Sequence, residues 1–199
     1  MAPVFRRPHA AQSANLSTHP SFVETVNQGA PILVGGFHDL VWIRVEGKGD
    51  FMNSPELKEF AIRMISRGQS NIVVDLEACP TMDSTFMGTL TGIALRVKAK
   101  HSGRLQVVNA NTRNQQLLES LGLDLIFDLD TDGSAWSRER DLVRENLERP
   151  EPPPQLEKKE RAEFVLEAHE DLCRANEDNI RRFKDVIEFL KNDIEEKDP

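Results

Sequence analysis

The stretch DLEACPTMDSTFMGTLTG, residues 75–92, joins an apolar strand to a helix, and the rest of the chain is organised around it. Residues 71–76 before the turn are continuously apolar at their centre, which is typical of a strand covered on both faces. After Cys79 and Pro80, a helix is expected to begin within residues 82–85. Because strand, helix and strand alternate here, the stretch predicts parallel strands joined by right-handed crossovers.

The beginning of this helix is the candidate functional position. A helix N-terminus has unpaired backbone N–H groups and partial positive charge, so a short oxygen-bearing side chain caps it and an added phosphate is stabilised there. Ser84 is therefore the candidate switch residue. A purely structural role is also consistent with the pattern, with Asp83 and Ser84 acting as an ordinary pair of capping residues.

Towards the N-terminus, residues 31–47 contain two β-rich runs around Gly35 and Gly36, which predict a hairpin. Ser54 followed by Pro55 indicates the start of a helix. The spacing of its apolar residues predicts one buried stripe: Leu57, Phe60, Ala61, Met64 and Ile65.

Towards the C-terminus, we expect a strand at residues 104–109, a helix at 112–121 and a closing strand at 125–129. The predicted order is β-β-α-β-α-β-α-β, an α/β fold with a mixed sheet flanked by helices. A further helix at residues 134–147 is expected to cover part of the sheet through Trp136 and Leu142.

Two glycines, Gly88 and Gly92, lie one turn apart in the helix that Ser84 opens. Glycine inside a helix costs about 1 kcal/mol relative to alanine, so the pair indicates a packing requirement. Close approach of the helix to the sheet would be such a requirement.

Composition changes divide the chain into four parts. Residues 1–28 are polar and without periodicity, which indicates a flexible tail. A globular domain follows at 29–148, then a proline-rich linker at 149–155 that predicts a stiff spacer. Residues 156–197 predict one long amphipathic helix.

His169, Asn176 and Asn179 interrupt the apolar stripe of this last helix. Polar residues in such a stripe can fix the register of a coiled coil, which predicts a homodimer through residues 156–197. The same pattern is also typical of a helix that lies on its parent domain.

The charge pattern excludes some classes of partner. The formal net charge is −8, and residues 139–199 carry most of it, with 19 acidic and 12 basic residues. Without a basic stripe we expect no nucleic-acid binding, and an acidic helix would be repelled by anionic lipid. No apolar run approaches the length of a membrane span and no export signal is visible, so we expect no membrane insertion and a cytoplasmic protein.

No pattern for catalysis, metal or cofactor binding is present. The chain lacks a phosphate-binding loop and a nucleophile elbow, and its five histidines are scattered singly. The pair His169-Glu170 is expected to be solvated surface on an exposed helix. Cys79 and Cys173 have neither disulfide nor zinc spacing. We expect a non-enzymatic protein without a cofactor.

The order of elements, the strand NIVVDL, the turn into MDST and the later run VVNANTRNQQLLESLGLDLIFDL resemble a STAS domain of the anti-sigma factor antagonist type. The resemblance covers residues 31–129. In that family the turn has the pattern D-S-[ST]-G-[LIM]-G, and the serine is phosphorylated. Asp83 and Ser84 match the first two positions, and Thr85 is a second hydroxyl. Phe86 replaces the usual glycine.

The resemblance implies a bacterial phosphoprotein that regulates transcription by partner switching. Unphosphorylated, it would bind an anti-sigma factor that is also a serine kinase; phosphorylation would release the kinase, and a PP2C-type phosphatase would reset the cycle. The phosphorylation site would be Ser84, with Thr85 as the alternative. The partner-binding residues would be Asn53, Ser54, Asp83, Ser84, Thr85, Phe86 and Met87.

Two other functions fit a STAS domain. The chain could be a scaffold or assembly component of a signalling complex, with the C-terminal helix building the oligomer and Ser84 never phosphorylated. It could also be an accessory subunit of a membrane transporter.

Overall fold

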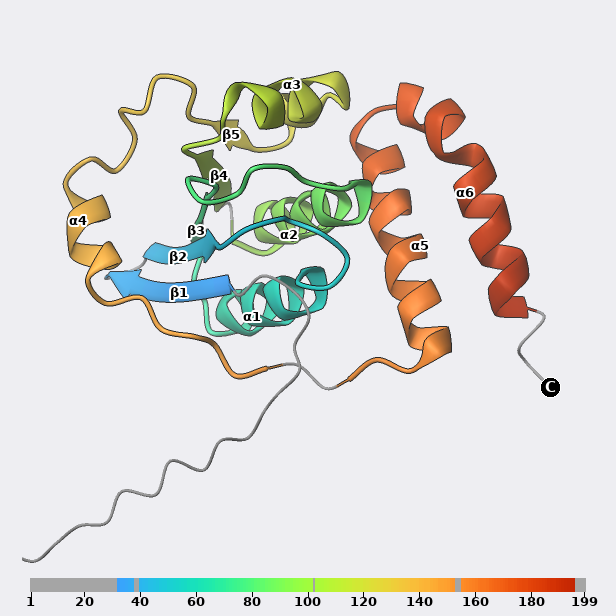
Figure 1. The fold of residues 1–199 in the computed structure, drawn as a ribbon, viewed down its shortest axis with the longest axis horizontal. Helices are drawn as coiled ribbons and strands as arrows, with labels where there is room; N and C mark the ends of the chain where they lie inside the picture. Colours follow the sequence, from blue (N-terminus) through green and yellow to red (C-terminus); the bar gives the residue numbers. More distant parts are fainter. Residues whose placement is uncertain (1–31, 38–39, 102, 153–154, 196–199) are drawn as a thin grey trace, which may run out of the picture.

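Five strands form one mixed sheet in the computed structural model, which describes residues 32–37, 40–101, 103–152 and 155–195 (Figure 1). The expected tail at residues 1–28 lies outside the described residues. The first two strands are antiparallel and the others run parallel to β2, in the order β1 (Ile32–Phe37), β2 (Leu40–Val45), β3 (Asn71–Asp75), β4 (Arg104–Val108) and β5 (Asp128–Leu129).

Alternation along the strands gives the sheet two apolar faces. In β2, Val41, Ile43 and Val45 point into the larger core, while Leu40 and Trp42 point to the opposite face. All five side chains are at most 4% exposed. In β3, Ile72 and Val74 join the larger core and Val73 the opposite face, all at most 1% exposed, so the expectation that residues 71–76 form a strand covered on both faces is confirmed.

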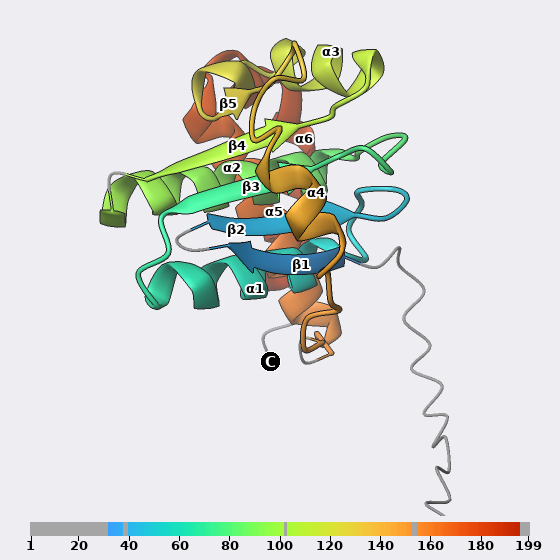
Figure 2. The same cartoon turned by 90° about the vertical axis from the view of Figure 1, so that its left-hand side faces the viewer.

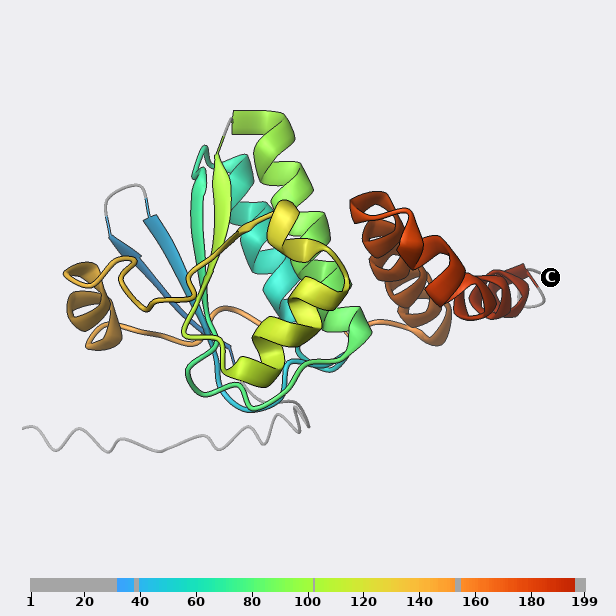
Figure 3. The ribbon, with the colours of Figure 1, turned by 90° about the horizontal axis from the view of Figure 1, so that it is seen from above.

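Helices α1 (Ser54–Ser66), α2 (Ser84–His101) and α3 (Thr112–Ser120) lie on one side of the sheet, and α4 (Glu139–Arg144) lies on the other (Figures 2 and 3). Apolar residues of the first three helices join the larger core, since their stripes face the strands. The predicted order of strands and helices is confirmed.

Two elements near the end of the domain are shorter than predicted. The expected strand at residues 125–129 is a 3₁₀ turn, η1 (Leu123–Leu125), followed by the two residues of β5. The helix expected at residues 134–147 contains only α4, which packs on the sheet through Val143. Leu142 was predicted to contact the sheet but is 51% exposed, because the helix turns Val143 inward.

After α4 the chain returns along the outer edge of the sheet. The backbone N–H of Val34 in β1 donates to the carbonyl of Glu148 at 2.7 Å, and Glu148 N–H donates to the Val34 carbonyl at 2.9 Å. This pairing satisfies backbone groups that the edge strand would otherwise leave exposed.

The C-terminal segment is helical, as expected, but it forms two helices, α5 (Lys158–Ala175) and α6 (Asp178–Glu195). Asn176 has extended backbone angles, φ −152° and ψ 130°, and therefore ends α5. The helix α5 packs on the side of α2 that faces away from the sheet, and α6 packs outside α5 (Figure 3). We call this pair the C-terminal hairpin.

Asn179 shows why the hairpin folds back onto the domain. Its side-chain amide donates to the carbonyl of Leu121 at 3.0 Å and to that of Leu172 at 2.9 Å, and the residue is 1% exposed. Asn179, one of the polar residues that interrupt the apolar stripe, therefore links α6 to the end of α3 and to α5.

Candidate functional site

The N-terminus of α2 is capped by Asp83. Its Oδ1 accepts a hydrogen bond from the backbone N–H of Phe86 at 2.8 Å, the geometry of an N-cap carboxylate. Its Oδ2 accepts from the N–H of Phe51 at 3.0 Å, which attaches the loop before α1 to the start of α2. Asp83 is therefore the residue that caps the helix, a role for which the sequence offers both Asp83 and Ser84.

Ser84 is the first residue of α2, and its side chain has a different partner. Its Oγ lies 3.1 Å from Nε2 of His169, which belongs to α5. Ser84 is half-buried, whereas His169 is only 4% exposed. The expectation that His169 is solvated on an exposed helix is wrong, because α5 turns this residue towards α2.

In a neutral imidazole ring, the hydrogen bonds of His169 determine which ring nitrogen donates and which accepts. Its Nδ1 lies 2.8 Å from the carbonyl oxygen of Val165, which can only accept. Nδ1 therefore carries the proton, Nε2 accepts, and the Ser84 hydroxyl is the donor. Phe183 of α6 packs edge-on against the ring, with centroids 5.1 Å apart.

The other five residues predicted to bind a partner are buried: Asn53, Ser54, Thr85, Phe86 and Met87 are 0–6% exposed. Asn53 is the N-cap position of α1, one residue before the expected Ser54. Asn53 Oδ1 accepts from the N–H of Asp50, and Ser54 Oγ donates to the Asp50 carbonyl. In this structure these two side chains hold the loop before α1 instead of presenting an outer surface.

Phe86 is part of the apolar core, since its side chain is fully buried. A Cβ atom on Gly49 would lie 2.8 Å from the ring, so the glycine in the loop before α1 gives the ring its space. The side chain of Phe86 is therefore not available to a partner in this structure.

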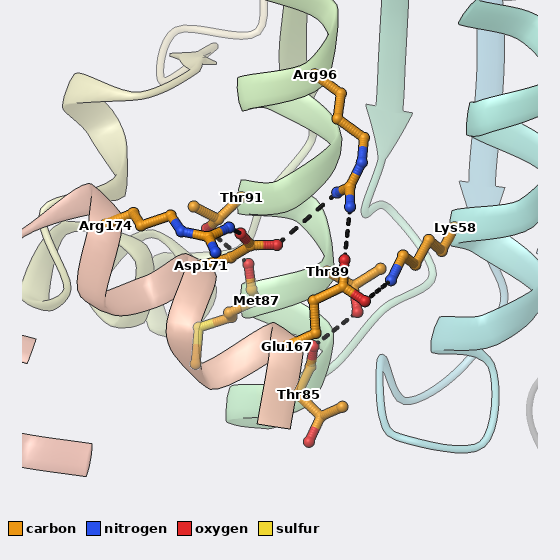
Figure 4. A network of polar contacts seen from close by, with 9 residues as sticks. All are labelled: Lys58, Thr85, Met87, Thr89, Thr91, Arg96, Glu167, Asp171 and Arg174. Atoms are coloured by element: carbon orange, nitrogen blue, oxygen red, sulfur yellow. Dashed lines mark hydrogen bonds and ion pairs between the residues drawn. The ribbon is translucent and has the colours of Figure 1, made fainter. Parts of the chain in front are cut away.

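Charged residues of α1, α2 and α5 form a network where these three helices meet (Figure 4). The carboxylate of Glu167 in α5 accepts from Lys58 of α1 and from Arg96 of α2. Asp171, one turn further along α5, lies 3.8 Å from Arg96 and also accepts from Arg174. No local sequence pattern indicates these five residues, because only the fold brings the three helices together.

The two carboxylates of this network respond to it in opposite ways. Burial raises the pKa of Glu167, but hydrogen bonds from Lys58 and Arg96 outweigh burial, so its pKa lies below the ordinary value. Burial dominates at Asp171 and raises its pKa despite the nearby Arg174 and Arg96.

The described residues offer little other chemistry. Among them, no group of three or more His, Cys, Asp or Glu side chains could hold a metal ion. Cys79 is buried, and burial raises the pKa of its thiol, which makes it a poor nucleophile. No helix in the ranges that the structure describes is long and apolar enough to cross a membrane.

Comparison with known proteins gives one family and several matching solved structures. The family model described as STAS domain matches residues 33–134, just over half of the chain. No curated protein matches.

Three of the matching solved structures are the following. Thermotoga maritima TM1081 is 20% identical with a TM-score of 0.47, and the match covers 56% of this chain and 92% of TM1081. An anti-sigma factor antagonist from Mycobacterium paratuberculosis is 20% identical with a TM-score of 0.46, covering 57% of this chain and 92% of that one. Phosphorylated Bacillus SpoIIAA, a cell fate determinant, is 22% identical with a TM-score of 0.45, covering 55% and 99%.

Proposed function

The chain belongs to the STAS-domain family, and we propose that it is a protein-binding switch controlled by phosphorylation of Ser84. In this proposal it is an anti-sigma factor antagonist, not an enzyme. It binds an anti-sigma factor with serine kinase activity while Ser84 is unmodified, and a PP2C-type phosphatase removes the phosphate.

The position of Ser84 is the observation that carries the proposal. Asp83 caps the helix, so the Ser84 hydroxyl is not required by the backbone and lies half-buried at the rim of α2. A phosphate there adds about −1.5 to −2 charges, which the N-terminus of α2 tolerates. An acidic or apolar partner surface does not, so binding weakens while the domain stays folded.

The burial of Thr85 favours Ser84 over the alternative hydroxyl. Thr85 is 6% exposed, whereas Ser84 is half-buried, so a kinase reaches Ser84 with less disturbance of the helix. We therefore expect phosphosite mapping by mass spectrometry, on protein purified from its native cell, to find phosphate at Ser84 and none at Thr85.

The corresponding binding test uses two substitutions of one residue. We expect Ser84→Ala to retain the kinase in co-purification and Ser84→Asp to lose it, with circular dichroism unchanged in both. The charge at position 84 is the tested variable. Equal retention by the two variants, together with no phosphate at Ser84, would refute the switch.

A scaffold function without phosphorylation is the second candidate. It is favoured by the hydrogen bond between Ser84 and His169, which gives the serine a structural partner inside the molecule. On this alternative, Ser84→Asp and Ser84→Ala differ in hairpin stability but capture the same partners.

A further inference from the structure

The C-terminal hairpin occupies the surface that the sequence marked for partner binding. It lies after residue 134, where the match to the family model ends. In addition to the contact of His169 with Ser84, Phe164 of α5 packs edge-on against Phe51 in the loop before α1, with centroids 6.5 Å apart. The hairpin therefore contacts both Ser84 and the loop before α1.

The face of α2 under the hairpin is shaped for a closely packed helix. A Cβ atom at Gly88 would lie 2.1 Å from the carbonyl oxygen of Ala168, and one at Gly92 would lie 2.1 Å from Oδ2 of Asp171. We expect from the sequence that the two glycines allow α2 to approach the sheet closely. In the structure they allow α5 to approach α2 closely.

The same face is also complementary in charge. Lys58 and Arg96 both hold Glu167, and the Lys58 ammonium lies 4.9 Å from the centroid of the Phe164 ring. An occupant of this face must therefore present a carboxylate between the two cations and a small residue opposite Gly88.

The threonine hydroxyls on the covered face of α2 are hydrogen-bonded within α2 itself. Thr89 Oγ donates to the carbonyl of Thr85, and Thr91 Oγ donates to that of Met87, both at 2.9 Å. When α5 leaves, these hydrogen bonds within α2 remain, and the charged residues of the network gain water.

A phosphate on Ser84 cannot keep the observed contact with a neutral His169 ring. The serine hydroxyl donates to Nε2, whereas a phosphoserine dianion has only acceptors and needs space now filled by the ring.

We propose that the C-terminal hairpin is an internal ligand of the α2 face: it covers Ser84 and competes with an external acidic helix for the same surface. Such a helix would place a small residue over Gly88 and a carboxylate between Lys58 and Arg96. The part that concerns phosphate rests on the proposed function. Occupation of the α2 face by the hairpin is independent of the proposed function.

The first test opens the hairpin in the full-length chain with Gly88→Ala. The added methyl group meets the backbone of α5, while alanine favours the α2 helix over glycine. We expect hydrogen–deuterium exchange in α5 and α6 to become about tenfold faster or more, with β3 and β4 still protected. Gly36→Ala is the matched control, because its Cβ would have only an ordinary contact at 3.8 Å.

Two results would overturn the inference. Unchanged exchange in α5 and α6 would mean that the face is not closed by this contact, and equal acceleration in β3 and β4 would make the hairpin an inseparable part of the core. Glu167→Lys supplies an independent variant, since it places a cation against Lys58 and Arg96 from a half-exposed position. We expect Glu167→Lys to accelerate hydrogen–deuterium exchange in α5 and α6 as well.

The charge at position 84 is tested by the same measurement, without a kinase. Exchange in α5 should be faster in Ser84→Asp than in Ser84→Ala, and faster in both than in the unmodified chain. Slower exchange in Ser84→Asp would mean that the hairpin binds more tightly beside a negative charge at position 84, which contradicts the proposal. Failure of the phosphorylation cycle would instead appear as absence of phosphate in cells, with the exchange results unaffected.

Discussion

Phe86 and Gly49 lie in contact although they are distant in sequence. The family that the chain resembles usually has glycine where this chain has Phe86, and here a glycine stands on the opposite side of the contact. The bulky ring and the missing side chain compensate for each other. We infer that the two positions are energetically coupled.

Substitutions at these two residues test the coupling. We expect Gly49→Ala to lower the free energy of unfolding by about 1–3 kcal/mol through overpacking, and Phe86→Ala by about 3–5 kcal/mol through the cavity it leaves. In the double variant the added methyl group has free space, so the combined loss should be smaller than the sum. Urea denaturation measures all three, and strict additivity would contradict the coupling.

At the same scale, the local part of the site could be predicted from sequence and its distant part could not. A strand, a turn and a short polar pair placed Asp83 and Ser84 at the start of α2. The partner of Ser84 comes from α5, 85 positions away, and no local pattern distinguishes a buried histidine from a solvated one. Burial of Phe86 likewise depends on Gly49.

At the scale of elements, Glu167 determines how the C-terminal hairpin responds to acid. Its pKa lies below the ordinary value because Lys58 and Arg96 favour the carboxylate. The stabilisation is therefore present above the pKa of the undocked residue and is lost as the pH falls through the docked value. Asp171 has the opposite effect on hairpin stability, because burial raises its pKa. Protonation of Asp171 removes a buried charge and therefore favours the docked hairpin.

This opposition gives a pH prediction for two matched variants. Protection factors of α5 amides, which correct for the intrinsic exchange rate, should decrease in the unmodified chain as the pH falls below about 4.3. Glu167→Gln should show lower protection at neutral pH and a smaller acid-dependent loss. Asp171→Asn should lose less protection than Glu167→Gln at neutral pH. A steeper acid loss in Glu167→Gln would contradict this assignment.

The elements themselves were predictable where one face is apolar. The strands and the helices α1–α3 follow from periodicity, since burial against a sheet selects for it. The break between α5 and α6 was missed because Asn176 is a single polar residue inside a continuous helical composition. Whether Asn176 ends a helix depends on how α5 and α6 pack, which the local sequence does not reveal.

At the scale of the whole molecule, the apolar side chains left on the outside of α6 are the remaining basis for a homodimer. Phe189 is 69% exposed, Ile180 54% and Val186 41%. Leu172, Ala175 and Phe183 of the hairpin pack against the core of the monomer. We therefore place the proposed interface on the exposed apolar residues of α6. The single coiled-coil helix of the sequence prediction is replaced by the hairpin.

Light scattering coupled to size-exclusion chromatography tests this interface. We expect the unmodified chain to form a dimer at high concentration and Phe189→Ser to be monomeric, because the substitution removes the largest exposed apolar side chain of α6. Leu125→Ser, at a residue that is 79% exposed in η1, is the control and should leave the dimer intact. A dimer that persists in Phe189→Ser would move the interface elsewhere.

Because α5 is part of the same polypeptide as the surface it occupies, closure is a unimolecular equilibrium. The fraction of molecules with an open face is therefore the same in a dilute cell and in a concentrated one. For a given pH and state of Ser84, an external helix competes with a hairpin whose closure does not depend on the expression level of this protein. The abundance and affinity of that helix then decide when it displaces the hairpin.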